Sequence, residues 1–232
     1  MPRLFVHVEG QTEENFVNEV LGEHLIRSGF ESVSARIVGN ARARHRRGGI
    51  RSWEPVRGDI LRHLRQDAGA VATLLVDYYA LPHDWPGRAE APRRQGSSRK
   101  AEHVETALLA DVVHVAGGRF DPRRFVPFVT MHEFEGLLFS SPELLAREIG
   151  RPDLASSFAE IRMQFETPED INDSAVTAPS KRILELCPQY EKPLFGTLAA
   201  IEIGLPAIRK ECPHFHDWLS CLEALPSELL IS

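Results

Sequence analysis

This sequence has few cysteines, and it lacks long apolar runs and an apolar leader segment. Its three cysteines, Cys187, Cys212 and Cys221, are too few and too odd in number for a disulfide framework. No stretch approaches the ~20 consecutive apolar residues that a membrane-spanning helix needs. The amino terminus has no long apolar region followed by a small-residue cleavage site, so no signal peptide is expected. We therefore expect a protein of the reducing cytoplasm.

Several chemical signatures are also missing. The pair Gly48-Gly49 lacks the spacing and the lysine of an ATP-binding loop, so any ATPase must be a separate partner. No serine with an adjacent histidine and acid is evident. The cysteines and histidines between residues 212 and 221 have a spacing that fits no zinc site. These absences leave chemistry that depends on carboxylates and basic residues.

The charge of the chain is unevenly distributed. Hydrophobic residues make up 43% of the 232 residues, enough for an ordinary core, and the net charge is −6. Nine arginines and two acids lie between residues 36 and 65, a net charge of +7. Between residues 133 and 232 there are 8 basic and 17 acidic residues, a net charge of −9. A basic segment of this kind can contact phosphates while the acidic remainder keeps the protein in solution.

Strand-like and helical patterns alternate in the first 140 residues. Strands are predicted at residues 3–8, 32–38, 70–76 and 124–130, with amphipathic helical patterns between them. Strand signals then stop, and helices are predicted at 133–139, 142–149, 152–165, 180–186 and 193–225. This order predicts an α/β fold, with a parallel sheet of about four strands flanked by helices over residues 1–140. Residues 141–232 are predicted to form a helical extension packed on that domain.

Acidic residues follow three of these strands directly. Glu9 comes after the first strand, Asp77 after the third, and Glu133 and Glu135 after the fourth. Because parallel strands end at the same edge of a sheet, we expect these carboxylates to share one site. Such oxygen ligands suit Mg²⁺ or Mn²⁺, which can orient and polarise a phosphate. The alternative is that each acid caps a helix or is solvated, which is how we interpret Glu13.

Four segments carry a resemblance to known proteins. They are the run from Val8 to Phe16, then Val76-Asp77-Tyr78-Tyr79, His132-Glu133-Phe134-Glu135 and Pro179-Ser180-Lys181-Arg182. The first resembles the first motif of Toprim domains, which occur in topoisomerases, primases and nucleases of the OLD type. The four in order resemble a family of small bacterial Toprim-like proteins of unknown function, often found beside ABC-type ATPases in phage-defence loci.

The resemblance implies a Toprim-like fold with specific acidic residues. It implies a catalytic or metal-binding acid at Glu9, which would also act as general base, and an Asp-x-Asp pair beginning at Asp77. The sequence departs from that pattern at Tyr79, where the second aspartate is expected. An acid after the fourth strand, or a displaced one such as Asp84, would have to compensate. The departure puts a two-metal mechanism in doubt.

Basic residues offer contacts for a nucleic-acid backbone. Arginine binds phosphate with two hydrogen bonds, and neighbouring glycines allow close approach. Candidates of this kind in the 42–51 loop are Arg42, Arg44, Arg46, Arg47 and Arg51. The alternatives are a solvated loop or a docking site for an acidic protein. A second basic group, between Arg88 and Lys100, is a further candidate beside the same site.

Two lysines are candidates for contact with the reacting phosphate. Lys181 lies in the fourth segment of the resemblance, and it would stabilise a pentavalent phosphate or its leaving oxygen. The alternative is an ordinary residue of a first helical turn. Lys192, before Pro193, is a weaker candidate.

These features predict a metal-dependent nuclease that acts on DNA or RNA, working with a partner ABC-type ATPase in anti-phage defence. The predicted catalytic residues are Glu9, Asp77 and Lys181, and the predicted Mg²⁺ or Mn²⁺ ligands are Glu9, Asp77, Glu133 and Glu135. The alternative, favoured by Tyr79, is a non-catalytic Toprim-fold module that binds an ATPase or nucleic acid. A metal-dependent cleavage assay separates the two.

Overall fold

A parallel β-sheet forms the centre of the molecule. The computed structural model describes residues 1–38, 50–172 and 177–230. The strands are β1 (Arg3–Val8), β2 (Ser32–Ile37), β3 (Ala70–Asp77), β4 (Phe125–Val126) and β5 (Val129–Thr130). They lie in the order β2-β1-β3-β4, with β5 also paired to β3, and every pairing is parallel. The predicted α/β fold with a parallel sheet is therefore confirmed.

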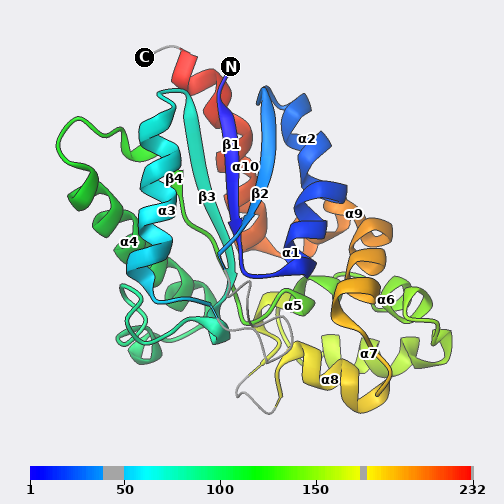
Figure 1. Cartoon of the computed structure of the whole chain (residues 1–232). Coiled ribbons are helices and arrows are strands. Elements are labelled where there is room, and N and C mark those ends of the chain that lie inside the picture. The colour runs from blue at the N-terminus through cyan, green and yellow to red at the C-terminus, as the bar shows by residue number, and fades with distance from the viewer. Residues whose placement is uncertain (39–49, 173–176, 231–232) are drawn as a thin grey trace.

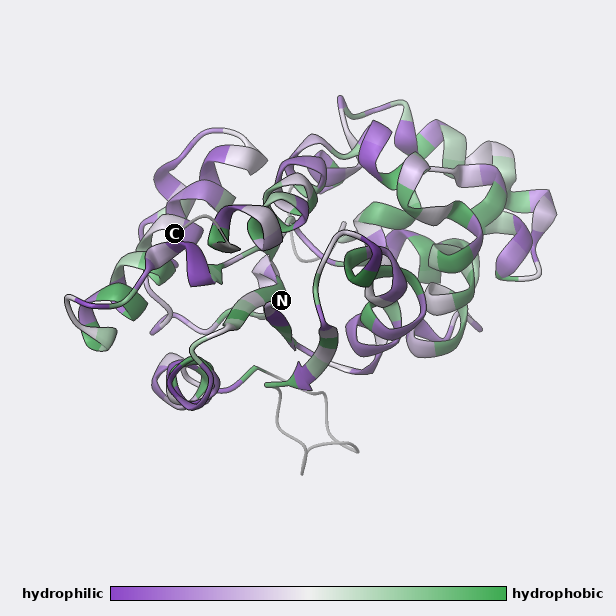
Figure 2. Ribbon diagram, turned by 90° about the horizontal axis from the view of Figure 1, so that it is seen from above, coloured by the Kyte–Doolittle hydropathy of each residue, from purple (hydrophilic) through white to green (hydrophobic). Residues whose placement is uncertain are grey.

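Helices connect the strands on both sides of the sheet (Figures 1 and 2). The helices between β1 and β2 are α1 (Gln11–Phe16), η1 (Val17–Leu21) and α2 (Gly22–Arg27). Between β2 and β3 lies α3 (Trp53–Gln66), and between β3 and β4 lies α4 (Ser97–Ala116). Short turns of helix are η3 (Tyr78–Ala80), η4 (Ala91–Arg93), η5 (Pro122–Arg124), η6 (Pro152–Leu154) and η7 (Pro168–Asp170).

The fourth predicted strand is divided in two. Residues 124–130 were expected to form one strand, but pairing with β3 is interrupted between β4 and β5. Pro127 lies at the interruption, and it has no backbone N–H to donate to the sheet. The prediction of a continuous strand was therefore wrong at its centre.

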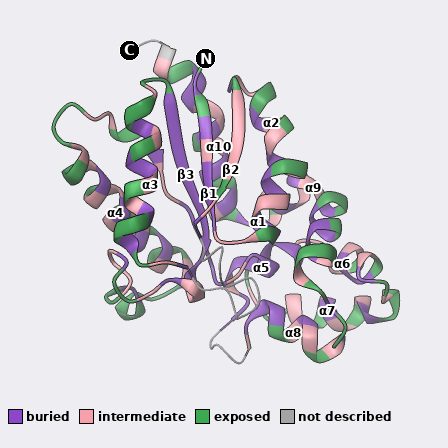
Figure 3. Cartoon of the chain, viewed as in Figure 1, coloured by how far each residue is buried: buried purple, intermediate pink, exposed green. Residues whose placement is uncertain are grey.

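The two faces of the sheet bury separate hydrophobic clusters. Side chains of a strand alternate between faces, so Leu4 and Val6 of β1 pack on one side with Leu75 of β3. Leu74 and Val76 of β3 pack on the other side, against α3 and α4. Every residue of β3 is buried, as its continuous apolar run predicted (Figure 3).

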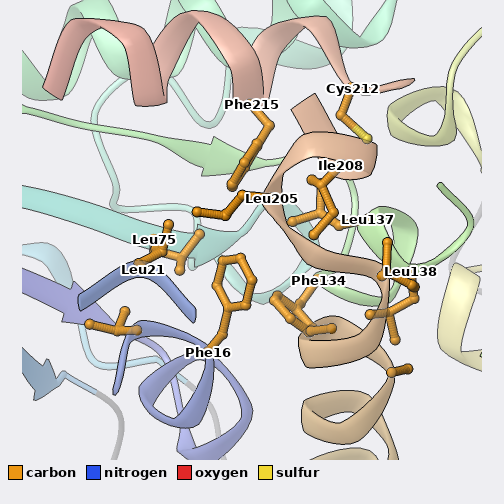
Figure 4. Packing of buried hydrophobic residues seen from close by; sticks show 14 of the residues in the cluster. Phe16, Leu21, Leu75, Phe134, Leu137, Leu138, Leu205, Ile208, Cys212 and Phe215 are labelled. Carbon is orange, nitrogen blue, oxygen red and sulfur yellow. The ribbon is translucent and has the colours of Figure 1, made fainter. Parts of the chain in front are cut away.

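The carboxyl-terminal region is helical and covers one face of the sheet (Figure 1). It consists of α5 (Glu135–Leu138), α6 (Pro142–Glu148), α7 (Ala155–Arg162), α8 (Pro179–Leu186), η8 (Lys192–Gly196), α9 (Thr197–Glu211) and α10 (Pro213–Leu230). In the close-up of the first hydrophobic cluster, Phe16 and Leu21 lie beside Phe134, Leu205 and Phe215 (Figure 4). Beyond residue 140, the described part of the chain contains no strand, as expected.

The segment 193–225 was predicted as one helical stretch, and the structure breaks it. Gly204 has φ 72° and ψ 159°, a conformation that kinks α9 and that glycine adopts readily. Cys212 then ends α9, because the residue before a proline, here Pro213, is disfavoured in helical geometry. None of the helices in the described ranges is long and apolar enough to cross a membrane.

Both ends of the described chain lie at the amino end of the sheet (Figure 1). Met1 and Leu229 line the same hollow there, together with Arg123 and Arg124. The carboxyl ends of the strands lie at the opposite end of the molecule, and the acidic residues collect there.

Candidate functional site

The two acids predicted from the strand ends lie at one edge of the sheet. Val8 of β1 is in register with Leu75 of β3, so Glu9 follows β1 beside the last residues of β3. Asp77 is the final residue of β3. The backbone N–H of Asp77 interacts with the Glu9 carboxylate and favours its ionised form. The fold therefore brings Glu9 and Asp77 together, although they are far apart in the sequence.

Asp77 is held rigidly in a buried position. Its side chain is 6% exposed, and its Oδ1 accepts a hydrogen bond of 2.8 Å from the backbone N–H of Phe134. Burial raises the pKa of Asp77 well above its ordinary value, and the nearby charges of Glu9 and Glu13 raise it further. Ionising this group therefore requires positive charge in the surroundings.

Glu13 belongs to the same group of acids, which the sequence did not predict. As expected, it caps the start of α1, where its Oε2 accepts a hydrogen bond of 3.0 Å from the Gly10 N–H. Yet it is only 7% exposed, and burial together with the charge of Glu135 raises its pKa. The sequence carries no signal that separates Glu13 from an ordinary acid of a first helical turn, because Glu9 lies before α1 begins.

Glu9 lacks a full set of partners. Its Oε2 is buried and has no hydrogen-bond partner within the described ranges. Burial and then the charge of Glu13 raise the pKa of Glu9 to about 8, although Lys192 opposes the shift. A carboxyl with this pKa holds a proton near neutral pH unless more positive charge comes close.

Glu135 lies deepest, and Lys192 pairs with it. Glu135 is fully buried, and its Oε2 accepts a hydrogen bond of 2.8 Å from Lys192 Nζ. Its Oε1 is buried and has no hydrogen-bond partner among the described residues. Burial alone would lower the pKa of Lys192, but the charges of Glu135, Asp77 and Glu133 raise it above its ordinary value.

The position of Lys192 depends on a close contact between η8 and α1. A Cβ atom at Gly196 would come within 3.1 Å of the Tyr190 hydroxyl and 3.3 Å of Thr12 Cγ2. Only glycine allows the backbone of η8 to approach α1 this closely without a shift of these neighbours. The segment η8 therefore supplies the ammonium group to Glu135 of α5, and its charge reaches the acids at the edge of the sheet and on α1.

The two acids after the fourth strand have different environments. Glu135 lies in the buried group, whereas Glu133 is half-buried and its Oε2 accepts a hydrogen bond of 3.0 Å from the Ser180 N–H. Glu133 thus caps α8, and its charge still acts on Lys192 and on Glu135. We define the acid cluster as Glu9, Glu13, Asp77 and Glu135.

The acid cluster offers the right atoms for a divalent ion, but not yet the right arrangement. Its ligands are all oxygens, which suit Mg²⁺ or Mn²⁺, and Glu9 Oε2 and Glu135 Oε1 are buried without partners. Within the described ranges, however, no three side chains of the His, Cys, Asp or Glu type are arranged to hold a metal ion. The ammonium of Lys192 is bound to Glu135, and its charge acts on Glu9, Glu13 and Asp77.

Tyr79, in place of an expected aspartate, fills its position with an aromatic ring. The ring of Tyr79 stacks on His132 with centroids 5.2 Å apart and planes at 22°. Its hydroxyl accepts a hydrogen bond of 2.7 Å from Asn172 Nδ2. Asp84 does not replace the missing acid, because its carboxylate accepts a hydrogen bond of 2.9 Å from the Trp53 N–H at the start of α3.

The structure brings Lys192 rather than Lys181 to the acids. Lys181 is exposed, and within the described ranges its ammonium forms no hydrogen bond or ion pair. Of the predicted phosphate-binding loop, Arg42, Arg44, Arg46 and Arg47 lie outside the described residues. Arg51 is described, and it donates to the Val38 carbonyl at 2.8 Å and to Asp59 at 2.6 Å, so its guanidinium is used within the fold.

The second basic group lies at the same end of the molecule as the acid cluster (Figure 1). Arg88 packs on the ring of Tyr78, with its guanidinium carbon 4.2 Å from the ring centroid, and donates to the Tyr78 hydroxyl at 3.2 Å. Arg93, Arg94 and Arg99 are exposed. Exposed arginines at this end are placed to contact a polyanion that reaches the carboxyl edge of the sheet.

The fold and the site define an α/β protein with a buried acidic centre at the carboxyl edge of a parallel sheet. The chain belongs to the family described as a domain of unknown function (DUF4276), which matches residues 8–223. A search of curated proteins finds no match to the sequence.

Among solved structures, the chain is similar to the carboxyl-terminal region of the OLD protein of Xanthomonas campestris pv. campestris. Crystals phased with iodine, mercury and platinum give TM-scores of 0.36, 0.38 and 0.37, each at 15% identity. The first two alignments cover 95% of this chain and 97% of the other, and the third covers 94% of each.

Proposed function

We propose that this protein is a Toprim-like, metal-dependent nuclease that cleaves phosphodiester bonds of DNA or RNA. The observation that carries the proposal is the acid cluster at the carboxyl edge of a parallel sheet, in which Glu13, Asp77 and Glu135 are buried and Glu9 is half-buried. One ammonium, that of Lys192, pairs with Glu135, and its charge acts on the other three acids. Burying several carboxylates without an equal number of positive charges is unfavourable in free energy. Binding of a divalent cation would therefore stabilise their ionised forms. Three of the four sequence segments that resemble Toprim-like proteins supply the residues of this cluster, and the fourth donates a hydrogen bond to Glu133 through the Ser180 N–H.

Glu9 and Asp77 would hold a Mg²⁺ or Mn²⁺ ion, with Glu13 and Glu135, or Glu133, completing the set of oxygen ligands. The ion would supply the positive charge that orients and polarises a phosphate. The chain's own contribution is to fix these oxygens, as the Phe134 N–H fixes Asp77 Oδ1.

Glu9 is the candidate general base. Its pKa of about 8 means that the free site holds a proton there at neutral pH. Added positive charge would lower this pKa and allow the carboxylate to accept a proton from an attacking water molecule. The exposed arginines between Arg88 and Arg99 would hold the nucleic-acid backbone through its phosphates.

A non-catalytic module is the second candidate, and two observations favour it. Tyr79 removes a carboxylate that the Toprim pattern supplies, and Lys192 already neutralises Glu135. In that case the same surface would bind nucleic acid or a partner ATPase without cleaving. Partnership with an ABC-type ATPase in anti-phage defence is proposed from the sequence resemblance.

A cleavage assay with matched variants tests the proposal. Plasmid DNA and single-stranded RNA are incubated with the wild type, with Glu9→Gln and with Glu19→Gln, which removes an exposed acid from η1. We expect cleavage only with Mg²⁺ or Mn²⁺, with a loss of at least about 100-fold in Glu9→Gln and none in Glu19→Gln. Binding without cleavage would favour the second candidate, and equal cleavage by wild type and Glu9→Gln would overturn the proposal.

A further inference from the structure

We propose that Lys192 is a tethered counter-ion of the acid cluster, which a divalent cation must displace from Glu135 in order to bind. The inference rests on the proposed metal site, and it concerns how that site is controlled. It assigns to Lys192 a role in regulating access of the ion rather than in contacting the substrate.

The position of the ammonium is the first observation. Lys192 Nζ lies 2.8 Å from Glu135 Oε2, and its charge acts on Glu9, Glu13 and Asp77 as well. The other oxygen of Glu135 has no hydrogen bond of good geometry within the described ranges, although the residue is fully buried and the Tyr190 hydroxyl lies beside this carboxylate. One ammonium therefore satisfies half of this carboxylate and leaves the cluster short of positive charge.

The absence of a preformed metal arrangement is the second observation. Among the described residues, no three acidic, histidine or cysteine side chains converge on one point, although four carboxylates lie together. A Mg²⁺ ion needs oxygens at about 2.1 Å, and an ammonium hydrogen-bonded to the same carboxylate would repel it at close range. The ion pair and a metal bound by Glu135 are thus alternative states of the site.

The partial exposure of Lys192 gives the ammonium a route to water. Its side chain is 40% exposed, although Glu135 is 1% exposed, so the flexible stem already reaches the surface. A rotation of this side chain would carry the ammonium into water without moving η8, whose backbone is fixed by the contact of Gly196 with α1. In the free protein the ion pair keeps the acids from being left without any positive charge.

A titration with Mn²⁺, followed by electron paramagnetic resonance, measures the competition. The wild type is compared with Lys192→Met, which keeps the stem and removes the charge, and with Lys192→Arg, which keeps the charge. Lys210→Met is the matched control, because it removes the same charge from a side chain that is 82% exposed on α9. We expect Lys192→Met to bind Mn²⁺ at least about tenfold more tightly than the wild type does. Lys192→Arg and Lys210→Met should bind Mn²⁺ with an affinity within about twofold of the wild type.

Each outcome has a definite meaning. The inference is supported if Lys192→Met binds Mn²⁺ more tightly than the wild type, or if it is the only one of the proteins that binds Mn²⁺. Equal or weaker binding by Lys192→Met overturns it and leaves the proposed metal site standing. If no variant binds Mn²⁺, both the inference and the proposed metal-dependent function fail.

A second measurement is made on the wild type, and a variant is needed only to assign the signal. The Lys192 ammonium, protected by its ion pair, is expected to give a distinct signal in ¹H–¹⁵N spectra of lysine Nζ groups, assigned by its loss in Lys192→Arg. Saturation with Mg²⁺ should remove or shift that signal as the ammonium enters water. An unchanged signal in protein saturated with Mg²⁺ would overturn the inference.

Discussion

Position 79 is the residue at which this chain departs most clearly from the pattern it resembles. The Tyr79 ring is stacked on His132 and its hydroxyl is bonded to Asn172, so the residue has a packing role of its own. An aromatic ring with two defined contacts therefore stands where the sequence resemblance implies a second aspartate.

Replacing Tyr79 with aspartate tests whether the missing carboxylate limits metal binding. The loss of the ring stack and the hydroxyl bond is expected to destabilise the protein by about 2 kcal/mol without metal, and Tyr79→Phe by about 1 kcal/mol. If the missing aspartate limits metal binding, Tyr79→Asp should bind Mn²⁺ more tightly, or bind a second ion. Calorimetric titration and urea unfolding of the three proteins measure both effects, and a Tyr79→Asp protein with unchanged Mn²⁺ binding contradicts the interpretation.

At the scale of helices and strands, α10 joins the carboxyl-terminal region to the sheet. Trp218 Nε1 donates to Thr73 Oγ1 of β3 at 2.9 Å, and the Trp218 ring stacks on Phe128 with centroids 4.5 Å apart. The same hydrophobic cluster contains residues of β1 and of α10. The sheet and α10 should therefore unfold in one cooperative step.

Trp218→Ala is expected to lower the free energy of unfolding by about 3–5 kcal/mol, because it leaves a large cavity beside the sheet. Trp53 and Trp85 remain as fluorescent reporters on the opposite face. Their transition in urea should shift together with the helical circular dichroism signal. Leu198→Ala, at a side chain that is 40% exposed, is the control and should change stability by about 0.5 kcal/mol or less.

Separate transitions for fluorescence and circular dichroism in Trp218→Ala would contradict this expectation. They would mean that the carboxyl-terminal helices form an independent unit. The predicted α/β domain (residues 1–140) and the helical extension (residues 141–232) would then unfold independently.

These elements show how much the sequence could predict. Glu9 and Asp77 were found because strand ends are visible in apolar runs, and parallel strands end at one edge. Pro127 was a visible signal for the break between β4 and β5, but the apolar residues around it favoured one strand. Lys192 could not be placed, because its contact with Glu135 depends on how η8 packs against α1.

At the scale of the whole molecule, stability should depend on pH through buried groups. His7 of β1 is fully buried, with Nδ1 3.3 Å from the Thr73 carbonyl and Nε2 3.1 Å from His63 Nδ1. Burial, and then the charge of His63, lower the pKa of His7 to about 3. The folded protein keeps this ring neutral while the unfolded chain protonates it below about pH 6.5, so its contribution to stability is lost as the pH falls from 6.5 towards 3.

His7→Phe should make unfolding less sensitive to acid. Between pH 6.5 and 5.0 the free energy of unfolding of the wild type is expected to fall by about 1.5 kcal/mol more than that of the variant. The raised pKa values of the acid cluster act in the opposite direction, but they cancel in this difference. Urea unfolding at the two pH values measures it, with His83→Phe at an exposed position as control. An equal fall in both proteins would show that His7 is not the responsible group.

The position of the chain ends has a practical consequence for handling the molecule. Met1 and Leu229 line one hollow at the amino end of the sheet, and the acid cluster lies at the other end. A tag, a dye or a surface linker attached at either end would leave the carboxyl edge facing the solution.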